Sequence, residues 1–221
     1  MLLFDMDGTL TDSNGIWKDV DREFLARRGI PYTHAYYEGV AHTIFPLAAQ
    51  FTKEFCHLPE SCEEIMAEWM ELASNLYDHV SVKPGVRAYL KQCKAEGRQL
   101  AVVTSSIPEH CHAALRHLDL EKYFDRITFA QQHGLEKREP EIWRVAAEEN
   151  GVRPEDCTVF DDSIAACRGA RAAKMRVVGV YDNYFSSDEP EMRGFCDVYI
   201  RSFEELLLPE KKSGHFTGRL L

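Results

Sequence analysis

Hydrophobic residues in the first third of the chain recur at the spacing of an amphipathic helix. Three such stripes cover residues 16–25, 40–55 and 65–76. Pro46 falls within the second stripe and is expected to kink or break it, and Ser61 with Glu64 has the spacing of a capping box before the third. No strand pattern separates the stripes, so we expect one helical unit over residues 15–80.

From residue 82 onward, helical stripes alternate with short apolar runs that have the length of strands. The expected strands cover residues 99–104, 126–129, 157–161, 176–180 and 198–200, and the expected helices cover 86–96, 140–149 and 164–173, with others starting at 108, near 189 and at 203. This alternation predicts right-handed βαβ crossovers and a parallel sheet with helices on both faces. We therefore expect an α/β fold: a Rossmann-like, doubly wound core of residues 1–14 and 81–221, with the helical unit as an insertion.

Composition narrows the possible partners. Of the 221 residues, 45% are hydrophobic and 28% are charged, as in ordinary globular proteins. A formal net charge of -10 argues against nucleic-acid backbones and anionic membranes as partners. No segment reaches the roughly 18 to 20 apolar residues of a membrane span, and only four residues precede Asp5, so we expect a cytoplasmic protein without a signal peptide.

The seven cysteines are odd in number and show no CxxC spacing, which indicates neither a disulfide framework nor a zinc site. Free thiols are the expected state. The sequence gives no sign of an oligomer, and a monomer is the default expectation.

Two acidic residues follow directly on the apolar run Leu2–Phe4, which has the character of a buried strand. Because strand side chains alternate, Asp5 and Asp7 share one face, and Gly8 lets the backbone turn close to a ligand. Two carboxylates this close repel each other unless a cation or a shared proton lies between them, and Mg²⁺ fits best when a phosphate completes its shell. Taken alone, such a pair is better explained by an edge strand followed by an Asp-Gly turn.

Further polar residues stand at comparable positions downstream. Those that follow later strands are Thr104, Ser105, Asp161 and Asp162, and Lys137 stands before the helix expected at 140–149. Each has an ordinary explanation on its own, because Thr, Ser and Asp cap helix N-termini and charged runs usually face solvent. Their order and their placement at strand ends favour a shared site instead, because the carboxyl ends of parallel strands lie at one edge of a sheet.

In this order the set resembles the four motifs of the haloacid-dehalogenase superfamily of phosphotransferases, and the resemblance covers nearly the whole chain. Asp5-x-Asp7-Gly8-Thr9 is similar to the first motif and Thr104-Ser105 to the second, while Lys137 is similar to the third and Asp161-Asp162 to the fourth. The resemblance implies a Rossmann-like core with a helical cap domain inserted after the first strand, where residues 15–80 lie. In the third motif the Pro that commonly follows the Lys is displaced, and Arg138 stands in its place.

The resemblance also implies a role for each motif residue. Asp5 is the nucleophile that forms an aspartyl-phosphate, and Asp7 is the acid/base that protonates the leaving oxygen and then activates water. Thr104 and Lys137 bind and neutralise the phosphoryl group. The implied Mg²⁺ ligands are Asp5, Asp7, Asp161 and Asp162, with Asp7 contributing its backbone carbonyl. The implied substrate is a small phosphorylated metabolite.

Residues beyond the motifs are candidates for substrate contact. These are Ser105, Arg138, Asn14, Trp17 and His42. Trp17 and His42 belong to the expected cap, from which the superfamily draws its selectivity, and Asn14 directly precedes it. Polar, turn-prone segments at 13–14 and 81–83 are the expected hinges between cap and core.

Hydrolysis is one of three functions that fit this pattern. Enzymes of the β-phosphoglucomutase type share the cap and the acid pair, and use a cap His about ten residues after the acid/base Asp. Counted from Asp7 that position is Trp17, which favours a phosphatase, although His42 could substitute for the missing His. A non-catalytic phosphometabolite-binding module is the third alternative, and the presence of every catalytic acid argues against it.

Overall fold

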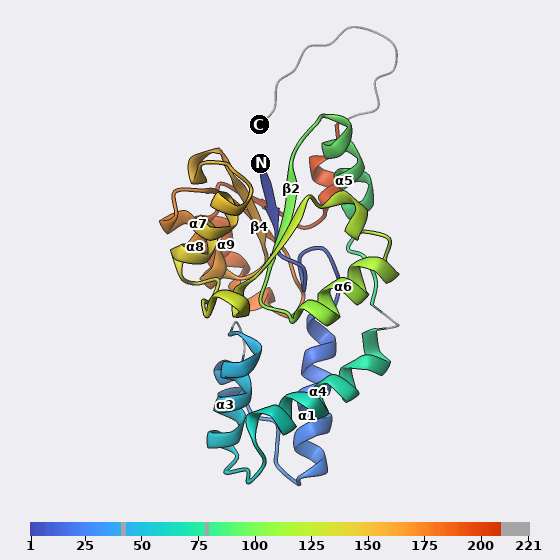
Figure 1. The fold of residues 1–221 in the computed structure, drawn as a ribbon, viewed down its shortest axis with the longest axis vertical. Helices are drawn as coiled ribbons and strands as arrows, with labels where there is room; N and C mark the ends of the chain where they lie inside the picture. Colours follow the sequence, from blue (N-terminus) through green and yellow to red (C-terminus); the bar gives the residue numbers. More distant parts are fainter. Residues whose placement is uncertain (41–42, 78–79, 209–221) are drawn as a thin grey trace, which may run out of the picture.

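A six-stranded parallel sheet forms the core of the larger of two lobes in the computed structural model, which describes residues 1–40, 43–77 and 80–208 (Figure 1). The strands are β1 (Leu2–Phe4), β2 (Leu100–Thr104), β3 (Arg126–Phe129), β4 (Thr158–Asp161), β5 (Arg176–Val180) and β6 (Val198–Ile200). Their order is β3-β2-β1-β4-β5-β6, and every pairing is parallel. This is the doubly wound order of Rossmann-like folds, so the expected α/β class is confirmed.

Helices cover both faces of the sheet (Figure 1). One face carries α5 (Val86–Ala95) and α6 (Pro108–His117), and the other carries α7 (Pro140–Glu149), α8 (Ile164–Ala172) and α9 (Glu189–Phe195). Short 3₁₀ helices cover Glu121–Tyr123, Ala130–His133, Pro154–Asp156, Ser186–Asp188 and Phe203–Leu206. Side chains of neighbouring strands pack against each other on these faces. On the face that carries α5, the Phe4 and Phe160 rings are stacked with their centroids 4.6 Å apart. Among the residues described, no helix is both long enough and apolar enough to cross a bilayer.

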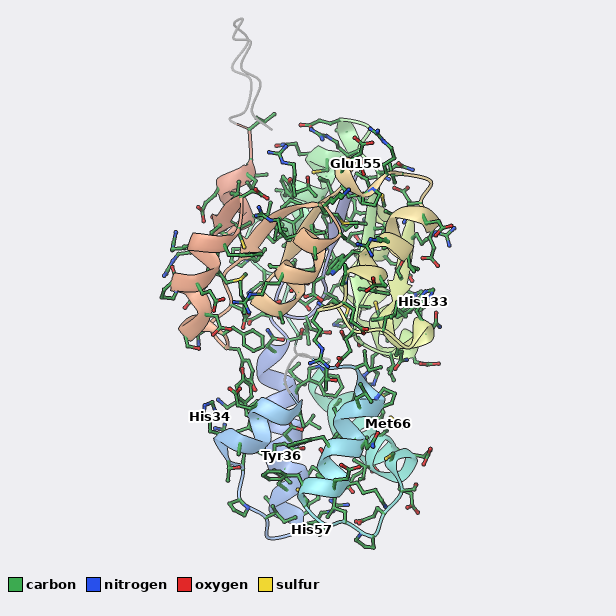
Figure 2. All side chains as sticks on the ribbon, turned by 90° about the vertical axis from the view of Figure 1, so that its left-hand side faces the viewer. His34, Tyr36, His57, Met66, His133 and Glu155 are labelled. Atoms are coloured by element: carbon green, nitrogen blue, oxygen red, sulfur yellow. The ribbon has the colours of Figure 1, made fainter. Side chains whose placement is uncertain are left out.

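The smaller lobe consists of α1 (Asn14–Arg27), α2 (His34–Val40), α3 (Phe45–Phe55) and α4 (Cys62–Tyr77). These helices pack around their own apolar cluster, in which Tyr36 is fully buried (Figure 2). The second expected stripe forms two helices, because Pro46 lies in the first turn of α3, where its missing N–H leaves no bond unmade. The capping box at α4 is present: the backbone N–H of Glu64 donates to Ser61 Oγ, and that of Ser61 to Glu64 Oε2.

Two chain segments join the lobes and lie side by side. The backbone N–H of Asp12 donates to the carbonyl of Ser81 at 2.9 Å, and that of Lys83 donates to the carbonyl of Leu10 at 3.0 Å. These are the segments expected to act as hinges. The separate apolar clusters of the two lobes support our proposal that residues 15–80 form a cap domain on a core of residues 1–14 and 81–221.

Candidate active site

Three buried carboxylates gather where the carboxyl ends of β1 and β4 meet. Asp5 follows β1, Asp161 ends β4, and Asp162 comes next. One carboxylate oxygen from each residue lies within 4.8 Å of the other two, and no more than 4% of any of the three residues is exposed. The strand order reverses between β1 and β4, and doubly wound folds bind their ligands at that point.

Lys137 is the cation of this acid cluster. Its Nζ donates to Asp5 Oδ1 at 2.5 Å and to Asp161 Oδ2 at 2.9 Å. Burial alone would lower the pKa of Lys137, but the charges of Asp161 and Asp5 raise it above its ordinary value, so the ammonium stays charged. The Lys137 carbonyl accepts a hydrogen bond from Trp143 Nε1 at 2.7 Å, and a Cβ on Gly169 would lie 2.2 Å from the same oxygen. The glycine in α8 therefore allows the lysine segment to approach the sheet edge.

One lysine does not neutralise three carboxylates. Burial raises the pKa of Asp5 to about 6, with the charge of Lys137 lowering it and that of Asp161 raising it. Burial and the charges of Asp5 and Asp161 raise the pKa of Asp162 well above its ordinary value. Asp5 Oδ2 is buried and has no hydrogen-bond partner. Clustered carboxylates with such an oxygen fit a hard divalent cation, so the acid cluster could hold one.

The loop after β1 orients Asp162. Thr9 Oγ1 donates to Asp162 Oδ1 at 3.2 Å, and Asn14 Nδ2 donates to Asp162 Oδ2 at 2.8 Å. Gly8 has a φ of 87°, and a Cβ at this position would lie 2.2 Å from Asp162 Oδ2. The tight turn thus requires glycine. Asn14, expected to contact substrate, lines the cleft and also bonds to an acid of the cluster from the first turn of α1.

Asp7 lies beside the acid cluster: within the described residues, its carboxylate is not among those that converge. Its Oδ1 accepts a hydrogen bond from Ser13 Oγ at 2.6 Å. Ser13 Oγ also lies 2.8 Å from Thr11 Oγ1, which donates to the carbonyl of Met6 at 3.0 Å. An ionised Asp7 accepts a hydrogen bond from Ser13, and a protonated Asp7 can donate one to Ser13 while the Ser13 hydroxyl donates to Thr11. This hydroxyl chain serves both protonation states of Asp7.

Hydroxyl groups follow β2 at the same edge. Thr104 is buried and its Oγ1 accepts a hydrogen bond from the backbone N–H of Ser106 at 3.0 Å, while Ser105 is half-buried. The N-cap of α6 is Ile107, so none of these three hydroxyl residues caps the helix. The alternative explanation, in which they serve only as a helix cap, is wrong here. Ser106 Oγ is buried without a hydrogen-bond partner and lines the site, and this role was not expected from the sequence.

A cleft between the two lobes opens onto these groups. The core contributes Asp5, Asp7, Thr104, Lys137 and Asp162, and the cap contributes Trp17, Asp21, Tyr37, Phe45 and Trp69. The Trp17 ring lies 5.5 Å from the Phe45 ring and 5.9 Å from the His110 ring, so it touches both lobes. Arg138 also lines the cleft, with 65% of its side chain exposed and its guanidinium paired with Glu136. His42 lies outside the described residues.

Sequence reasoning also missed Lys83 and Asp21. Lys83 Nζ donates to the carbonyls of Gly8 at 2.5 Å and Tyr181 at 2.7 Å and to Asp182 Oδ2 at 2.6 Å, so it ties the loop after β1 to the loop after β5. A lysine beside an expected hinge was the available signal. Asp21 is an acid within the apolar stripe of α1, and that position was the signal for it.

Comparison with known proteins gives a match over most of the chain. Residues 2–180 match the family model described as haloacid dehalogenase-like hydrolase. A phosphorylated carbohydrates phosphatase of Thermotoga maritima is 30% identical over 81% of this chain and 84% of its own length. A β-phosphoglucomutase of Mycobacterium bovis is 27% identical over 93% of this chain and 90% of its own. The crystal structure of CbbY from Rhodobacter sphaeroides in complex with phosphate superposes with a TM-score of 0.79 at 26% identity, over 93% of this chain and 95% of that one.

Proposed function

Because the chain belongs to the haloacid dehalogenase-like hydrolase family, we propose that it is a phosphatase that hydrolyses phosphoric monoesters of small metabolites. One observation carries this proposal: Asp5 lines the cleft as a buried carboxylate, with one oxygen held by Lys137 and the other without a hydrogen bond. A carboxylate positioned in this way can act as a nucleophile toward phosphorus.

Asp5 attacks the phosphorus of the bound ester, and the bond from phosphorus to the leaving oxygen breaks as the aspartyl-phosphate forms. Lys137 and the Thr104 hydroxyl neutralise and orient the phosphoryl oxygens, and positioning with charge neutralisation is most of what phosphoryl transfer requires. Ser105 and Ser106, which line the same edge of the cleft, supply further donors.

Asp7 moves the proton in both halves of the reaction. Protonated, it donates to the leaving oxygen; ionised, it takes a proton from the water that attacks the aspartyl-phosphate. The hydroxyl chain of Ser13 and Thr11 supports this exchange, since Ser13 can donate to the carboxylate or accept from the acid.

Mg²⁺ is the cation we propose for the acid cluster. The ligands would be carboxylate oxygens of Asp5, Asp161 and Asp162 and the backbone carbonyl of Asp7. When bound, Mg²⁺ neutralises these acids and the charge on the phosphoryl group. The orphaned Oδ2 of Asp5 is the observation that supports a cation here.

Trp17 favours hydrolysis over phosphosugar mutation. It occupies the position ten residues after Asp7, where the mutase type uses a His, and its ring packs against Phe45 in the cleft. An indole N–H donates a hydrogen bond and accepts no proton, so this position cannot relay a proton to a second sugar hydroxyl. We expect β-glucose 1-phosphate, supplied with Mg²⁺ and a bisphosphate primer, to release free phosphate faster than it yields glucose 6-phosphate. The reverse order would establish the mutase, with His42 as the residue to replace next.

Turnover of para-nitrophenyl phosphate tests the proposed function. We expect Mg²⁺-dependent hydrolysis that EDTA abolishes and that Asp5→Asn lowers by about a thousandfold or more. Asp12→Asn is the matched control, because Asp12 is an exposed acid in the same loop and lies outside the cleft. Activity retained in Asp5→Asn would remove Asp5 as the nucleophile. Phosphate-ester binding without turnover by the native protein would identify a non-catalytic binding module.

A further inference from the structure

Asp21 is an acid in the wall of the cleft that the proposed chemistry does not use. It lies on α1, seven residues after Asn14, and a helical rise of about 1.5 Å per residue places it about 10 Å further along the helix axis from the acid cluster. Asn14, Trp17 and Asp21 are spaced i, i+3 and i+7, which puts them on one face of α1, and all three line the cleft. Asp21 therefore stands at the end of the cleft that would receive the leaving group.

Asp21 has a hydrogen bond but no cationic partner within the described part of the chain. Tyr36 donates its hydroxyl to Asp21 Oδ1 at 3.3 Å, and the same hydroxyl lies 2.9 Å from Thr52 Oγ1. The adjacent Arg22 lies 3.8 Å from Asp19 on the exposed side of the helix. Burial raises the pKa of Asp21 to about 7, which means that the charged form is disfavoured in the folded protein. A cation brought by a bound molecule would stabilise the charged form of this acid.

Aromatic rings line the same cleft as this acid. They belong to Trp17, Tyr37, Phe45, Trp69 and Tyr184. The Phe45 and Trp69 rings lie 5.3 Å apart, and so do the Tyr37 and Tyr184 rings. Burial raises the pKa of the Tyr184 phenol, and the charge of Asp21 contributes to that rise, so the two groups are close enough to interact. Lys18 Nζ lies 5.3 Å from the centroid of the Tyr184 ring without lining the cleft. At this distance the face of an aromatic ring attracts a cation.

We propose that the preferred substrate is a phosphate monoester whose leaving group carries an organic cation, an amino or quaternary ammonium group bound by Asp21 and the aromatic rings. The proposal rests on the proposed function, which places the phosphoryl group at Lys137 and Thr104. The cleft then has Lys137, Thr104 and the proposed cation site at one end for the phosphate, and an acidic, aromatic end for the ammonium. A ring face and a carboxylate together are the groups that bind organic cations in proteins. An uncharged polyol would leave the Asp21 carboxylate without a counter-charge.

A matched pair of esters tests the charge alone. Phosphocholine and its carbon isostere dimethylbutyl phosphate have the same shape, and differ in the positive charge of the terminal group. In the native enzyme we expect kcat/KM to be at least about tenfold higher for phosphocholine, mainly through KM. In Asp21→Asn we expect the two values to fall within about threefold of each other.

Asp19→Asn is the control variant, because it removes one negative charge from an exposed site on the same helix, and it should keep the native preference. Equal kcat/KM for the two esters in the native enzyme, or a preference retained in Asp21→Asn, would overturn the proposal. A hexitol phosphate that outperforms phosphocholine and loses that advantage in Asp21→Asn would assign Asp21 to a hydroxyl group and overturn it as well.

Failure of the proposed function has a different signature: the native protein would turn over none of these esters, para-nitrophenyl phosphate included. In that case calorimetry with choline alone decides the inference. Choline binding by the native protein that Asp21→Asn loses and Asp19→Asn keeps would uphold the cation site. The absence of choline binding by the native protein would overturn it.

Discussion

Lys137 is the residue that makes the acid cluster possible. Its ammonium bonds to Asp5 and Asp161, and only 12% of its side chain is exposed. Removing one partner of a buried ion pair leaves uncompensated charge in a poorly solvated place, which is more damaging than losing the pair's own attraction. The lysine therefore has a structural role in addition to its place beside the phosphoryl group.

Lys137→Met should lower the free energy of unfolding by about 3–5 kcal/mol in EDTA, because the acids lose their only cation among the described residues. Added Mg²⁺ should restore part of the loss by binding the native state, while kcat stays about 10²–10³-fold reduced. Thermal and urea unfolding with and without Mg²⁺ measure this. Lys94→Met removes an exposed partner of Asp125 and should change stability by about 0–1 kcal/mol. Equal effects of the two substitutions would contradict the account.

The free energy of unfolding should depend on pH through Asp21. Its pKa is raised from 3.8 to about 7 by burial, and the hydrogen bond from Tyr36 only partly offsets the rise. The folded state therefore holds more protons than the unfolded state between these values, and the unfolding free energy falls as pH rises from about 4 to about 7. Asp21→Asn should raise the Tm by a margin that grows over this interval and stays constant above it. Melting curves of both proteins at several pH values measure this difference in Tm. A difference that stays constant or shrinks over the interval would contradict the account.

The sequence was informative about residues whose chemistry is encoded locally. Asp5, Asp161 and Asp162 were expected together because each follows an apolar strand, and parallel strands end at one edge. Lys83 and Asp21 escaped this reasoning for one physical reason. Their partners come from other segments: Lys83 Nζ contacts Gly8, 75 residues away in sequence. Only the packed fold defines such contacts.

At the scale of elements, the amino-acid composition of α8 affects a segment that is distant in sequence, the one that carries Lys137. Its small residues include Gly169, where a Cβ would lie 2.2 Å from the Lys137 carbonyl oxygen. The consequence for Lys137 could not be predicted, because the lysine segment and α8 meet only in the folded protein. Pro46 was expected to kink or break the second stripe, and the stripe does divide, with Pro46 in the first turn of α3. Sequence periodicity alone does not separate two helices that share one apolar stripe.

Gly169→Ala tests the contact between α8 and the lysine segment. A Cβ would lie 2.2 Å from the Lys137 carbonyl oxygen and 2.8 Å from the carbonyl carbon of Arg138, which are backbone atoms that must shift. We expect a loss of about 1–3 kcal/mol in stability and a fall in kcat, because the Lys137 ammonium moves with its backbone. Gly194→Ala in α9 meets nothing within 4 Å and should be neutral or slightly stabilising. A stable and fully active Gly169→Ala would contradict this account.

At the scale of the whole molecule, the cap closes over the carboxyl edge of the sheet (Figure 1). Several contacts cross between the lobes, among them Thr43 with Glu136, the Tyr32 and Tyr184 hydroxyls at 3.4 Å, and the Trp17 ring with that of His110. A closed cap excludes bulk water from a reactive acyl phosphate. The α/β core was predictable from its alternation of strands and helices, whereas these lobe-to-lobe contacts were not.

The position of the cleft between the lobes favours a small substrate over a macromolecular one. We expect kcat/KM for phosphoserine peptides to be at least about a hundredfold below that for small phosphate esters, since a peptide chain would hold the cap away from the core. Parallel assays of phosphate release measure the ratio. Comparable rates on peptides and small esters would contradict a cap that closes during turnover.

The central claim is that Asp5 carries the phosphoryl group between the two halves of the reaction. Rapid acid quenching during turnover, followed by borohydride reduction and peptide mass spectrometry, tests it most directly, because reduction converts an aspartyl-phosphate to homoserine. We predict homoserine at position 5 in the native enzyme incubated with substrate and Mg²⁺, and none in the absence of substrate or in Asp5→Asn. Turnover with no homoserine at position 5, or with the modification at another acid, would contradict the account.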